Sequence, residues 1–413
     1  MRAKFLLIPV ALLSVAVVVW WGVKPVAPRD APVRVSVQPA VSPGPGVVDS
    51  RTPPVAPRDS LIDAVWAAFS ADAANTKSAL DALELRRTRY PSDPTTTTAI
   101  RGFLDADAAN TKSALDALAL RLWGMPRDVA TGAIQGFLDG RNNAETRLPF
   151  AVGDGGNLST APTLRVWLLD QLGQLDPAAA ADYAQSILSA RESAEEWAVA
   201  LRDFARVRTG PADGVFLSTK MRVLLTEPRW QAEASVGWLE AFDVAVHLRD
   251  TTLAPELSRL LTRTEKQDKP AAFAAYLTLD RLVLAEPTAM LGRLQAEPDL
   301  MQGREQTRAN YFARADVRDP QQRALVEAYL ADPRHSPEEL AKFAGLYPNA
   351  NRMISKNLLT PTETPTRESL AAHDREALAV VTAWVEDARF ESIRPALEET
   401  RRRLEEFVRQ AGQ

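Results

Sequence analysis

Thirteen residues, ADAANTKSALDAL, occur twice in the chain, at residues 71–83 and again at residues 106–118. The two copies are identical and start thirty-five residues apart. A closed globular core seldom has room for an added segment, whereas an array of units that contact mainly their neighbours accepts one readily. The duplication therefore predicts a modular fold, and it gives little reason to place an active centre within residues 61–140.

Both copies show the helical period. Leu80, Leu83 and the alanines between them form an apolar stripe, which predicts a helix that ends before a break at residues 90–94. A second helix follows, with Ile100 and Phe103 on one face. Each unit is thus predicted to be a helix–turn–helix. The second copy repeats this order with Leu115, Leu118, a break at residues 125–128, and then Ile134, Phe137 and Leu138.

Short amphipathic helices are predicted over residues 161–413. They include ADYAQSIL, VGWLEAFDVAVHL, FAAYLTLDRLVL, RALVEAYL and ELAKFAGLYP. An acidic residue followed by proline is a sound helix start, because proline suits the first helical position and a carboxylate can cap it. Runs of alternating β-type residues are nearly absent, so we predict an all-α fold of six to eight hairpins. The acidic-proline pairs begin at Asp176, Glu227, Glu286, Glu297, Asp319 and Asp332.

The period and pairing of these helices over residues 61–413 resemble the HEAT and tetratricopeptide repeat superfamilies. The DPAAA run at residues 176–180 is similar to the turns between units of such arrays. The Trp-Leu-Gly-Tyr series of tetratricopeptide repeats is not present in order. The resemblance implies an α-solenoid-like array of helical hairpins, and it carries no activity, because fold alone does not determine function.

The N-terminus carries a targeting signal. Residues 5–23 form an uncharged, mostly apolar run that follows the basic residues Arg2 and Lys4. As a helix this run would be about 28 Å long, close to the hydrocarbon thickness of a bilayer. We predict a cytoplasmic tail at residues 1–4 and a transmembrane anchor at residues 5–23, with the bulk of the chain exported from a bacterial inner membrane. A cleaved signal peptide is the alternative, and it exports the chain as well.

Two further segments interrupt the helical pattern. Residues 24–60 contain nine prolines and two copies of PVAPRD, so we predict a semi-rigid linker of polyproline II character. Residues 141–160 contain the glycine cluster GDGGN at residues 153–157. We interpret this segment as a junction loop in which glycines supply turns of positive φ. It lacks the lysine and the spacing of a phosphate-binding loop.

Composition excludes several classes of site. The chain has 413 residues, no cysteine and a net charge of −4, and its basic residues form no stripe. Thiolate chemistry and disulfides are therefore excluded, and nucleic acid is not an expected partner. The three histidines, His247, His335 and His373, show no metal-ligand spacing, and each is interpreted as a packed or surface residue.

No residue qualifies as catalytic, cofactor-binding or metal-ligating by motif, so we predict no cofactor. Lytic transglycosylases pair a helical superhelix with a Glu-Ser dipeptide, and this chain has two such dipeptides, Glu192-Ser193 and Glu391-Ser392. Both lie in polar stretches interpreted as helix, and the other elements of that family are missing. They are therefore not predicted to be catalytic.

The C-terminal helix at residues 395–413 is predicted to cap the array. Three pairs at i,i+4 spacing, Glu398–Arg402, Glu399–Arg403 and Glu405–Arg409, favour the helix. A short apolar seam favours either packing against the preceding helices or, as the sharper alternative, self-association through this helix. The seam consists of Leu397, Leu404, Val408 and Ala411.

These features favour a membrane-anchored, exported helical scaffold of the bacterial cell envelope that binds a protein partner. An enzyme is not the leading interpretation. The alternative is an envelope hydrolase of cell wall or glycan whose carboxylate site has no sequence signature. A third interpretation is a purely structural protein.

Overall fold

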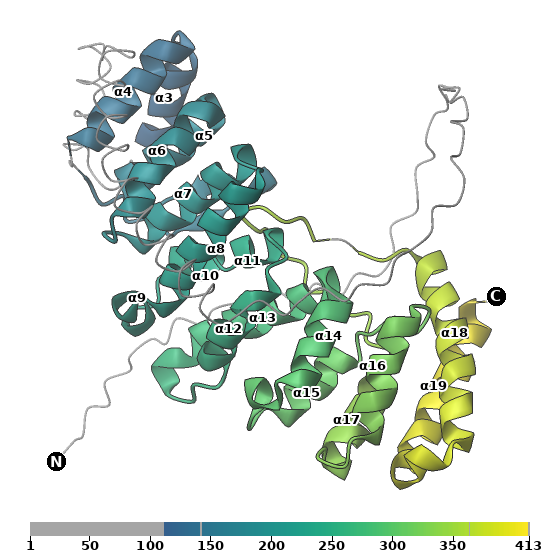
Figure 1. The fold of residues 1–413 in the computed structure, drawn as a ribbon. Coiled ribbons are helices and arrows are strands. Elements are labelled where there is room, and N and C mark those ends of the chain that lie inside the picture. Colours follow the sequence, from purple (N-terminus) through teal and green to yellow (C-terminus); the bar gives the residue numbers. More distant parts are fainter. Residues whose placement is uncertain (1–110, 141–142, 363, 412–413) are drawn as a thin grey trace, which may run out of the picture. The chain divides into compact units, whose positions relative to one another are not determined.

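The computed structural model describes residues 111–140, 143–362 and 364–411, all of which belong to one compact unit. This part of the chain is an all-α fold of helical-repeat type (Figure 1). The α-helices are α3 (Thr111–Trp123), α4 (Arg127–Asp139), α5 (Leu164–Leu175), α6 (Pro177–Ser189), α7 (Ala194–Val207), α8 (Pro211–Thr226), α9 (Pro228–Ala232), α10 (Val236–Glu240), α11 (Asp243–His247), α12 (Ala254–Leu261), α13 (Lys269–Ala285), α14 (Pro287–Ala296), α15 (Glu305–Phe312), α16 (Pro320–Ala331), α17 (Pro337–Leu346), α18 (Arg367–Glu386) and α19 (Arg394–Ala411). Short 3₁₀ helices are η3 (Asp154–Gly156), η4 (Thr251–Leu253), η5 (Lys266–Asp268), η6 (Pro298–Met301) and η7 (Ala388–Ile393).

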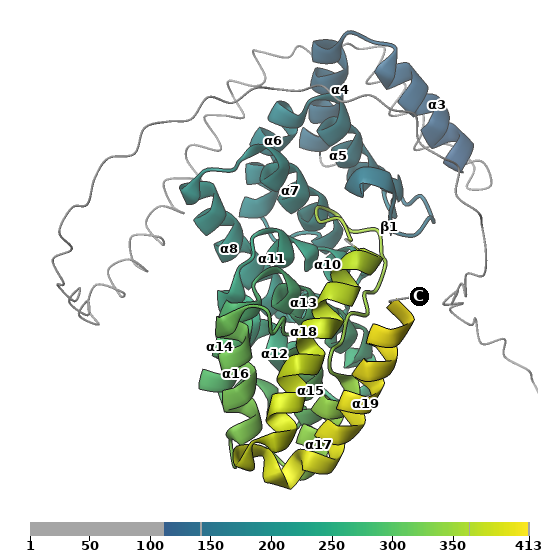
Figure 2. The ribbon, with the colours of Figure 1, turned by 90° about the vertical axis from the view of Figure 1, so that its right-hand side faces the viewer.

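Helices pack mainly against helices that are close in sequence, and Figure 1 shows them following one another from α3 to α19. The pairs α6–α7, α12–α13 and α18–α19 make extensive contacts, and Figure 2 shows α18 and α19 side by side. Neighbouring helices share one continuous apolar core. This is the arrangement expected of stacked hairpins.

The hairpin of the second sequence copy forms as predicted. Helix α3 buries Leu115, Leu118 and Leu122, and it ends at Trp123. Helix α4 begins at Arg127, within the predicted break at residues 125–128, and it buries Ile134, Phe137 and Leu138 among others. The first copy lies outside the described residues.

Acidic-proline pairs begin helices, but only aspartate caps them. The carboxylates of Asp176 and Asp319 accept backbone N–H bonds in the first turns of α6 and α16. Glu227, Glu286 and Glu297 precede α9, α14 and η6 without a side-chain cap. The shorter side chain is the one suited to the N-cap position.

The prediction for Asp332-Pro333 is wrong. Helix α16 ends at Ala331, and Asp332 is its C-cap. The Asp332 carboxylate instead accepts a bond from the backbone N–H of Arg334 at 2.9 Å and pairs with that guanidinium. The next helix, α17, starts at Pro337 and is capped by the Ser336 hydroxyl.

A second repeat, with an offset of 143 residues, becomes visible in the structure. In each copy an arginine forms a buried, two-pronged pair with a glutamate thirty-one residues later: Arg165 with Glu196 at 2.7 and 3.1 Å, and Arg308 with Glu339 at 2.8 Å twice. Between each pair lies an Asp-Pro helix start, at Asp176 in α6 and at Asp319 in α16. Each glutamate occupies the first turn of a serine-capped helix. The three-helix units α5–α7 and α15–α17 are therefore built alike.

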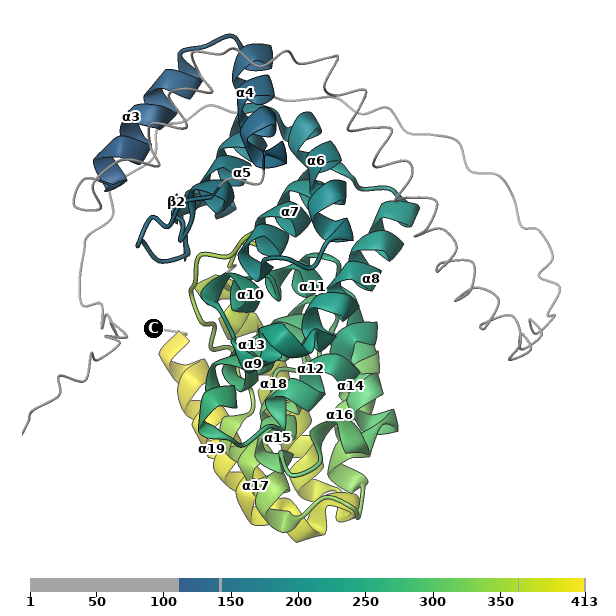
Figure 3. The same cartoon turned by 90° about the vertical axis from the view of Figure 1, so that its left-hand side faces the viewer.

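The junction at residues 141–160 contains a short β-hairpin, which the sequence did not predict. Strand β1 (Ala151–Val152) pairs antiparallel with β2 (Leu158–Thr160), and Figure 3 shows the hairpin beside α5. Gly155 and Gly156 have φ values of 65° and 74°, so these two glycines supply the turn as predicted.

Buried ion pairs hold this hairpin against the helices. Arg202 of α7 is fully buried, pairs with Asp170 of α5, and donates to the Gly156 carbonyl at 3.0 Å. Asp170 accepts the backbone N–H of Leu158 at 2.9 Å. A buried arginine is tolerated only with such partners, so the junction is part of the core.

After Tyr347, the C-cap of α17, residues 348–366 lead to α18 and run back toward the earlier helices (Figure 2). We call these residues the return segment; residue 363 lies outside its described part. Its Leu358 side chain is completely buried. The Leu358 carbonyl accepts from Arg206 of α7 at 3.4 Å and lies so close to Gly156 that a Cβ atom there would be 2.0 Å from it.

The predicted helix VGWLEAFDVAVHL is divided into α10 and α11. Between them the backbone forms i,i+3 bonds, from the N–H of Val244 to Ala241 and from Ala245 to Phe242. Such bonds tighten the helix locally. The prediction of one continuous helix is therefore wrong at this turn.

The C-terminal helix α19 packs on α18 and α17, and it buries Leu397 and Leu404, whereas Val408 is only partly buried and Ala411 is exposed. The three predicted i,i+4 pairs do not form. Arg403 donates instead to the carbonyls of Ala344 and Tyr347, because packing brings the end of α17 within its reach. The observed pairs include Arg402–Glu399 and Arg401–Glu405.

Among the described residues, none of the helices combines the length and apolarity needed to cross a membrane. The predicted tail, anchor and linker at residues 1–4, 5–23 and 24–60 lie outside the described residues.

Candidate functional site

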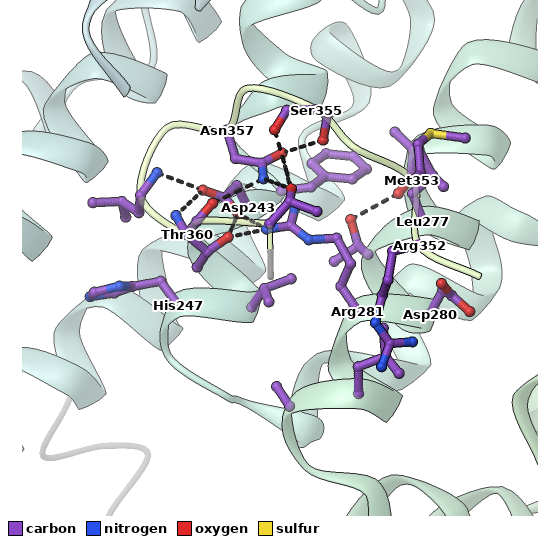
Figure 4. A pocket seen from close by; sticks show the side chains of 18 of the residues that line it. Asp243, His247, Leu277, Asp280, Arg281, Arg352, Met353, Ser355, Asn357 and Thr360 are labelled. Atoms are coloured by element: carbon purple, nitrogen blue, oxygen red, sulfur yellow. Dashed lines mark hydrogen bonds and ion pairs between the residues drawn. The ribbon is translucent and has the colours of Figure 1, made fainter. Parts of the chain in front are cut away.

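A cavity of about 780 Å³ lies between α10, α11, α13 and the return segment. Its volume is within the range of clefts that bind small molecules or short peptide segments. Figure 4 shows side chains from three separate stretches of sequence meeting around it. We interpret this cavity as the candidate functional site of the described residues.

Helix α13 supplies one wall. Pro270, Phe273, Leu277, Arg281 and Leu284 recur at three- and four-residue spacing, so they share one face of the helix, and all line the cavity. The wall is mostly apolar, and Arg281 lies on it between Leu277 and Leu284. Phe273 has 54% of its surface exposed although it is a large aromatic residue.

Asp243 is the hub between the helices and the return segment. Its Oδ2 accepts the backbone N–H groups of Leu359 and Thr360 at 2.6 and 3.0 Å. Its Oδ1 accepts the Thr360 hydroxyl and the Arg281 guanidinium, as Figure 4 shows. Arg281 also reaches Asn357 Oδ1 at 3.4 Å. Both Asp243 oxygens are thus occupied, and only 4% of the residue is exposed.

Glu240 lies one helical turn before Asp243 and lines the same cavity. Burial and the neighbouring Asp243 raise the pKa of Glu240 to about 7, and Arg281 opposes this shift. No hydrogen bond or ion pair joins Glu240 to any other described side chain. Glu240 is therefore a partly desolvated carboxyl group with no partner among the described residues.

Arg352 of the return segment is the basic counterpart of Glu240 in the cavity lining. Its Nη1 is buried and has no hydrogen-bond partner among the described residues. Burial and the nearby Arg314 lower the pKa of Arg352, and Asp280 acts in the opposite direction. Asp280 itself is paired with Arg314, so it does not neutralise Arg352 directly. Figure 4 places Arg352 near Asp280 and Arg281.

Two further lining residues are Met353, which is apolar, and His247, which is titratable. Met353 of the return segment is 54% exposed, like Phe273 of α13, and both line the cavity. His247 is on the far side of Asp243 in Figure 4. Partial burial lowers the pKa of His247, and Asp243 opposes that effect. At neutral pH the imidazole is mainly neutral.

The three histidines are not brought together. His247 lines the cavity, His335 is buried against Tyr329 with ring centroids 4.5 Å apart, and His373 lies near Asp316 at 3.8 Å. No group of three potential metal-ligating side chains occurs in the described ranges.

The two Glu-Ser dipeptides lie outside the cavity. Ser193 is the N-cap of α7, so Glu192 and Ser193 precede the helix and do not lie in it, contrary to the sequence interpretation. Glu391 belongs to the 3₁₀ helix η7 and pairs with Arg394. Both dipeptides therefore have structural roles in the described chain.

A sequence signal for the cavity existed but was missed. Glu240, Asp243 and His247 are spaced by three and four residues inside an otherwise apolar run, which places polar groups on one helix face. The return segment, in contrast, offers no such pattern, because an extended chain acquires its partners only in the folded protein.

The fold and the cavity define the chain as a protein of helical-repeat architecture with an amphipathic cleft. The comparisons add no narrower class: no protein-family model matches the chain, and no match is found among the curated proteins or the solved structures.

Proposed function

We propose that this protein is a membrane-anchored, exported helical scaffold that binds a protein partner along the face formed by α10, α11, α13 and the return segment. The observation that carries the proposal is the way this face holds a chain in extended form. Asp243 accepts two consecutive backbone N–H groups of the return segment, and Arg314 donates to two of its carbonyls, of Asn351 at 2.6 Å and Asn349 at 3.3 Å.

Contacts of this kind suit peptide recognition. Side chains that bond to backbone groups hold an extended segment with little dependence on its sequence, and neighbouring pockets then select side chains. Stacked hairpins also present an extended surface for such partners. The cavity beside Asp243 provides the selective pocket.

The anchor and the linker complete the proposal. The apolar run at residues 5–23 would hold the chain in the inner membrane, and the proline-rich residues 24–60 would space the array from the bilayer. An alkaline phosphatase fusion after Ser60 should be active if the array is exported. An inactive fusion, together with an active cytoplasmic reporter at the same position, would contradict the localisation.

Partner binding is tested by photocrosslinking in living cells. A benzoylphenylalanine at Ile354, which is 78% exposed on the return segment, should give an adduct of one discrete mass. The same group at Val215 of α8, which is also exposed but does not line the cavity, is the matched control. Adducts at neither position, or equal adducts at both, would count against the proposed face.

The hydrolase is a second candidate because Glu240 and Asp243 share the cavity. A carboxyl group whose pKa is near 7 is suited to donate a proton at neutral pH. However, a carboxylate-pair mechanism needs a second carboxylate that is free to act on water or substrate, and both oxygens of Asp243 are occupied. Glycan or cell-wall turnover by the purified chain that is abolished in Glu240→Gln would establish the hydrolase over the scaffold.

Self-association through α19 is also proposed. Phe407 is a large apolar residue on this helix and is 39% exposed. Sedimentation of the full chain should show a dimer that Phe407→Ser dissociates, and a monomer in both cases would exclude this contact.

A further inference from the structure

Most charged groups that line the cavity already have partners within the protein. Asp243 pairs with Arg281, Asp280 pairs with Arg314, and Arg249 lies 3.3 Å from Glu286. After these pairs are accounted for, one anion and one cation of the lining have no partner among the described residues. They are Glu240 of α10 and Arg352 of the return segment.

An unpartnered charge in a partly desolvated site costs free energy, so a pair of opposite unpartnered charges fits a ligand that carries both kinds of group. Arg352 has a buried N–H group directed to no acceptor, which a carbonyl or carboxylate oxygen would satisfy. Glu240 would be satisfied by an ammonium or guanidinium group.

The apolar wall adds a third requirement. Phe273 and Met353, from α13 and the return segment, both line the cavity and are more than half exposed, and Leu277 lies one helical turn from both Phe273 and Arg281. Large apolar side chains exposed together around a concave site typically contact a ligand. The ligand therefore needs an apolar group beside its cation.

The contacts to the return segment show how side chains of the array bind an extended chain. Arg314 donates to the backbone carbonyls of the return segment, and Asp243 accepts its N–H groups. Arg352 lies close to Arg314 and is placed to do the same for a second strand of polypeptide. This analogy favours a peptide over a small free zwitterion.

We propose that the cavity binds an extended peptide segment in which a lysine or arginine stands next to an apolar residue. Glu240 pairs with the basic side chain, Arg352 donates to a backbone carbonyl, and Phe273 with Met353 covers the apolar side chain. This inference rests on the proposed scaffold function, and it specifies the chemistry of the partner.

The test uses the purified full chain with benzoylphenylalanine in place of Phe273, which preserves an aromatic group at the wall. Fluorescent peptides Ala-Leu-Lys-Leu-Ala, Ala-Leu-Glu-Leu-Ala and Ala-Ser-Lys-Ser-Ala are irradiated with it in turn. We expect the basic apolar peptide to be captured about tenfold more than either of the other two, which corresponds to about 1.4 kcal/mol of discrimination. The same crosslinker at Val215 should capture all three equally weakly.

Two substitutions identify the groups. Glu240→Gln should remove the preference for lysine over glutamate, whereas Glu233→Gln, an exposed glutamate outside the cavity, should leave it intact. Arg352→Gln should reduce capture of the basic and the acidic peptide together, because the backbone carbonyl is common to both.

Equal capture of the three peptides, a preference that survives Glu240→Gln, or capture no stronger than at Val215 would overturn this inference. Preferential capture of a free lysine derivative over the peptide would point to a small zwitterionic ligand and would overturn it as well. The cellular crosslink from Ile354 is an independent measurement. A discrete partner there, with no peptide preference here, would reject the cavity chemistry and leave the scaffold function standing.

Discussion

At the scale of single residues, the two acidic neighbours in the cavity differ because of their partners. Asp243 is deeply buried and accepts four hydrogen bonds, whereas Glu240 is partly buried and accepts none from described side chains. Burial without partners disfavours the charged form of a carboxyl group. Ionised Glu240 therefore lowers the stability of the folded protein.

Replacing Glu240 with glutamine should change stability in a pH-dependent manner. The folded pKa of Glu240 is raised to about 7 from its usual value of 4.5. The folded state consequently holds a proton that the unfolded state releases, and wild-type stability falls as the pH rises between these two values. Above pH 7, Glu240→Gln should be more stable than wild type by on the order of 2 kcal/mol, and near pH 4.5 the two should be equal.

Urea unfolding at pH 4.5, 6 and 8 measures this effect. Glu233→Gln is the control, and it should show no difference from wild type at any of these pH values. A constant difference for Glu240→Gln across the pH range would mean that folding does not shift the pKa of this carboxyl group.

The two long-range arginine–glutamate pairs should contribute strongly to folding specificity. Burial by itself would raise the pKa of Glu339, but hydrogen bonds from Arg308 and Tyr329 outweigh it and hold that pKa at about 2. Glu339→Gln leaves Arg308 buried without a counter-charge, so the free energy of unfolding should fall by about 3–5 kcal/mol.

The exposed pair Arg208–Asp182 is the matched comparison, because both side chains are at least two-fifths exposed. Asp182→Asn should cost less than about 1 kcal/mol in the same denaturant titration. Similar losses in the two variants would show that the Arg308–Glu339 pair is not as desolvated as its burial indicates.

At the scale of elements, residues nearby in sequence determine where most helices begin, but they do not always determine where helices end or turn. Four side chains cap helices by accepting backbone N–H bonds from residues two or three positions later in the sequence. They are Ser193, Ser336, Asp176 and Asp319. The break between α10 and α11, by contrast, has no glycine or proline. It arises from i,i+3 bonds that the surrounding packing selects.

Capping aspartates should matter more than the glutamates that stand in the same sequence context. Asp319→Ala should lower the free energy of unfolding by about 1 kcal/mol, because two backbone N–H groups in the first turn of α16 lose their acceptor. Glu286→Ala should cost a few tenths of that, since Glu286 does not cap α14. Thermal unfolding of the two variants distinguishes them, and equal shifts would mean that the proline alone specifies these helix starts.

At the scale of the whole molecule, the repeat offset of 143 residues shows that similar three-helix units occur far apart in the chain. Few residues are identical between the units, and those that are include the arginine, the Asp-Pro pair and the Ser-x-Glu-Glu cap. These positions hold ion pairs and caps, whereas the apolar positions vary in size. Cores accept such variation when volume is kept, which is why the repeat is hard to detect from composition.

Modularity predicts that one copy of the duplicated unit is dispensable. A full chain that lacks residues 71–105 retains one complete copy of the thirteen-residue segment. Its main cooperative transition should lie within about 4 °C of wild type, because units of an array contact mainly their neighbours. Circular dichroism with heating provides the measurement. Loss of the cooperative transition would show that the duplicated region is integral to the core.

The sequence alone determined the all-α class, the second-copy hairpin with a turn near Pro126, and the helix starts at Asp176 and Asp319. These features depend on contacts within one or two helical turns, so the local pattern is sufficient for them. It also excluded thiolate chemistry and disulfides, because the chain has no cysteine. Only the tertiary structure decided the course of the return segment, the four bonds to Asp243 and the isolation of Glu240 and Arg352. Three of the four bonds to Asp243 join residues more than a hundred positions apart, and the partners that an extended segment finds depend on packing that no local period encodes.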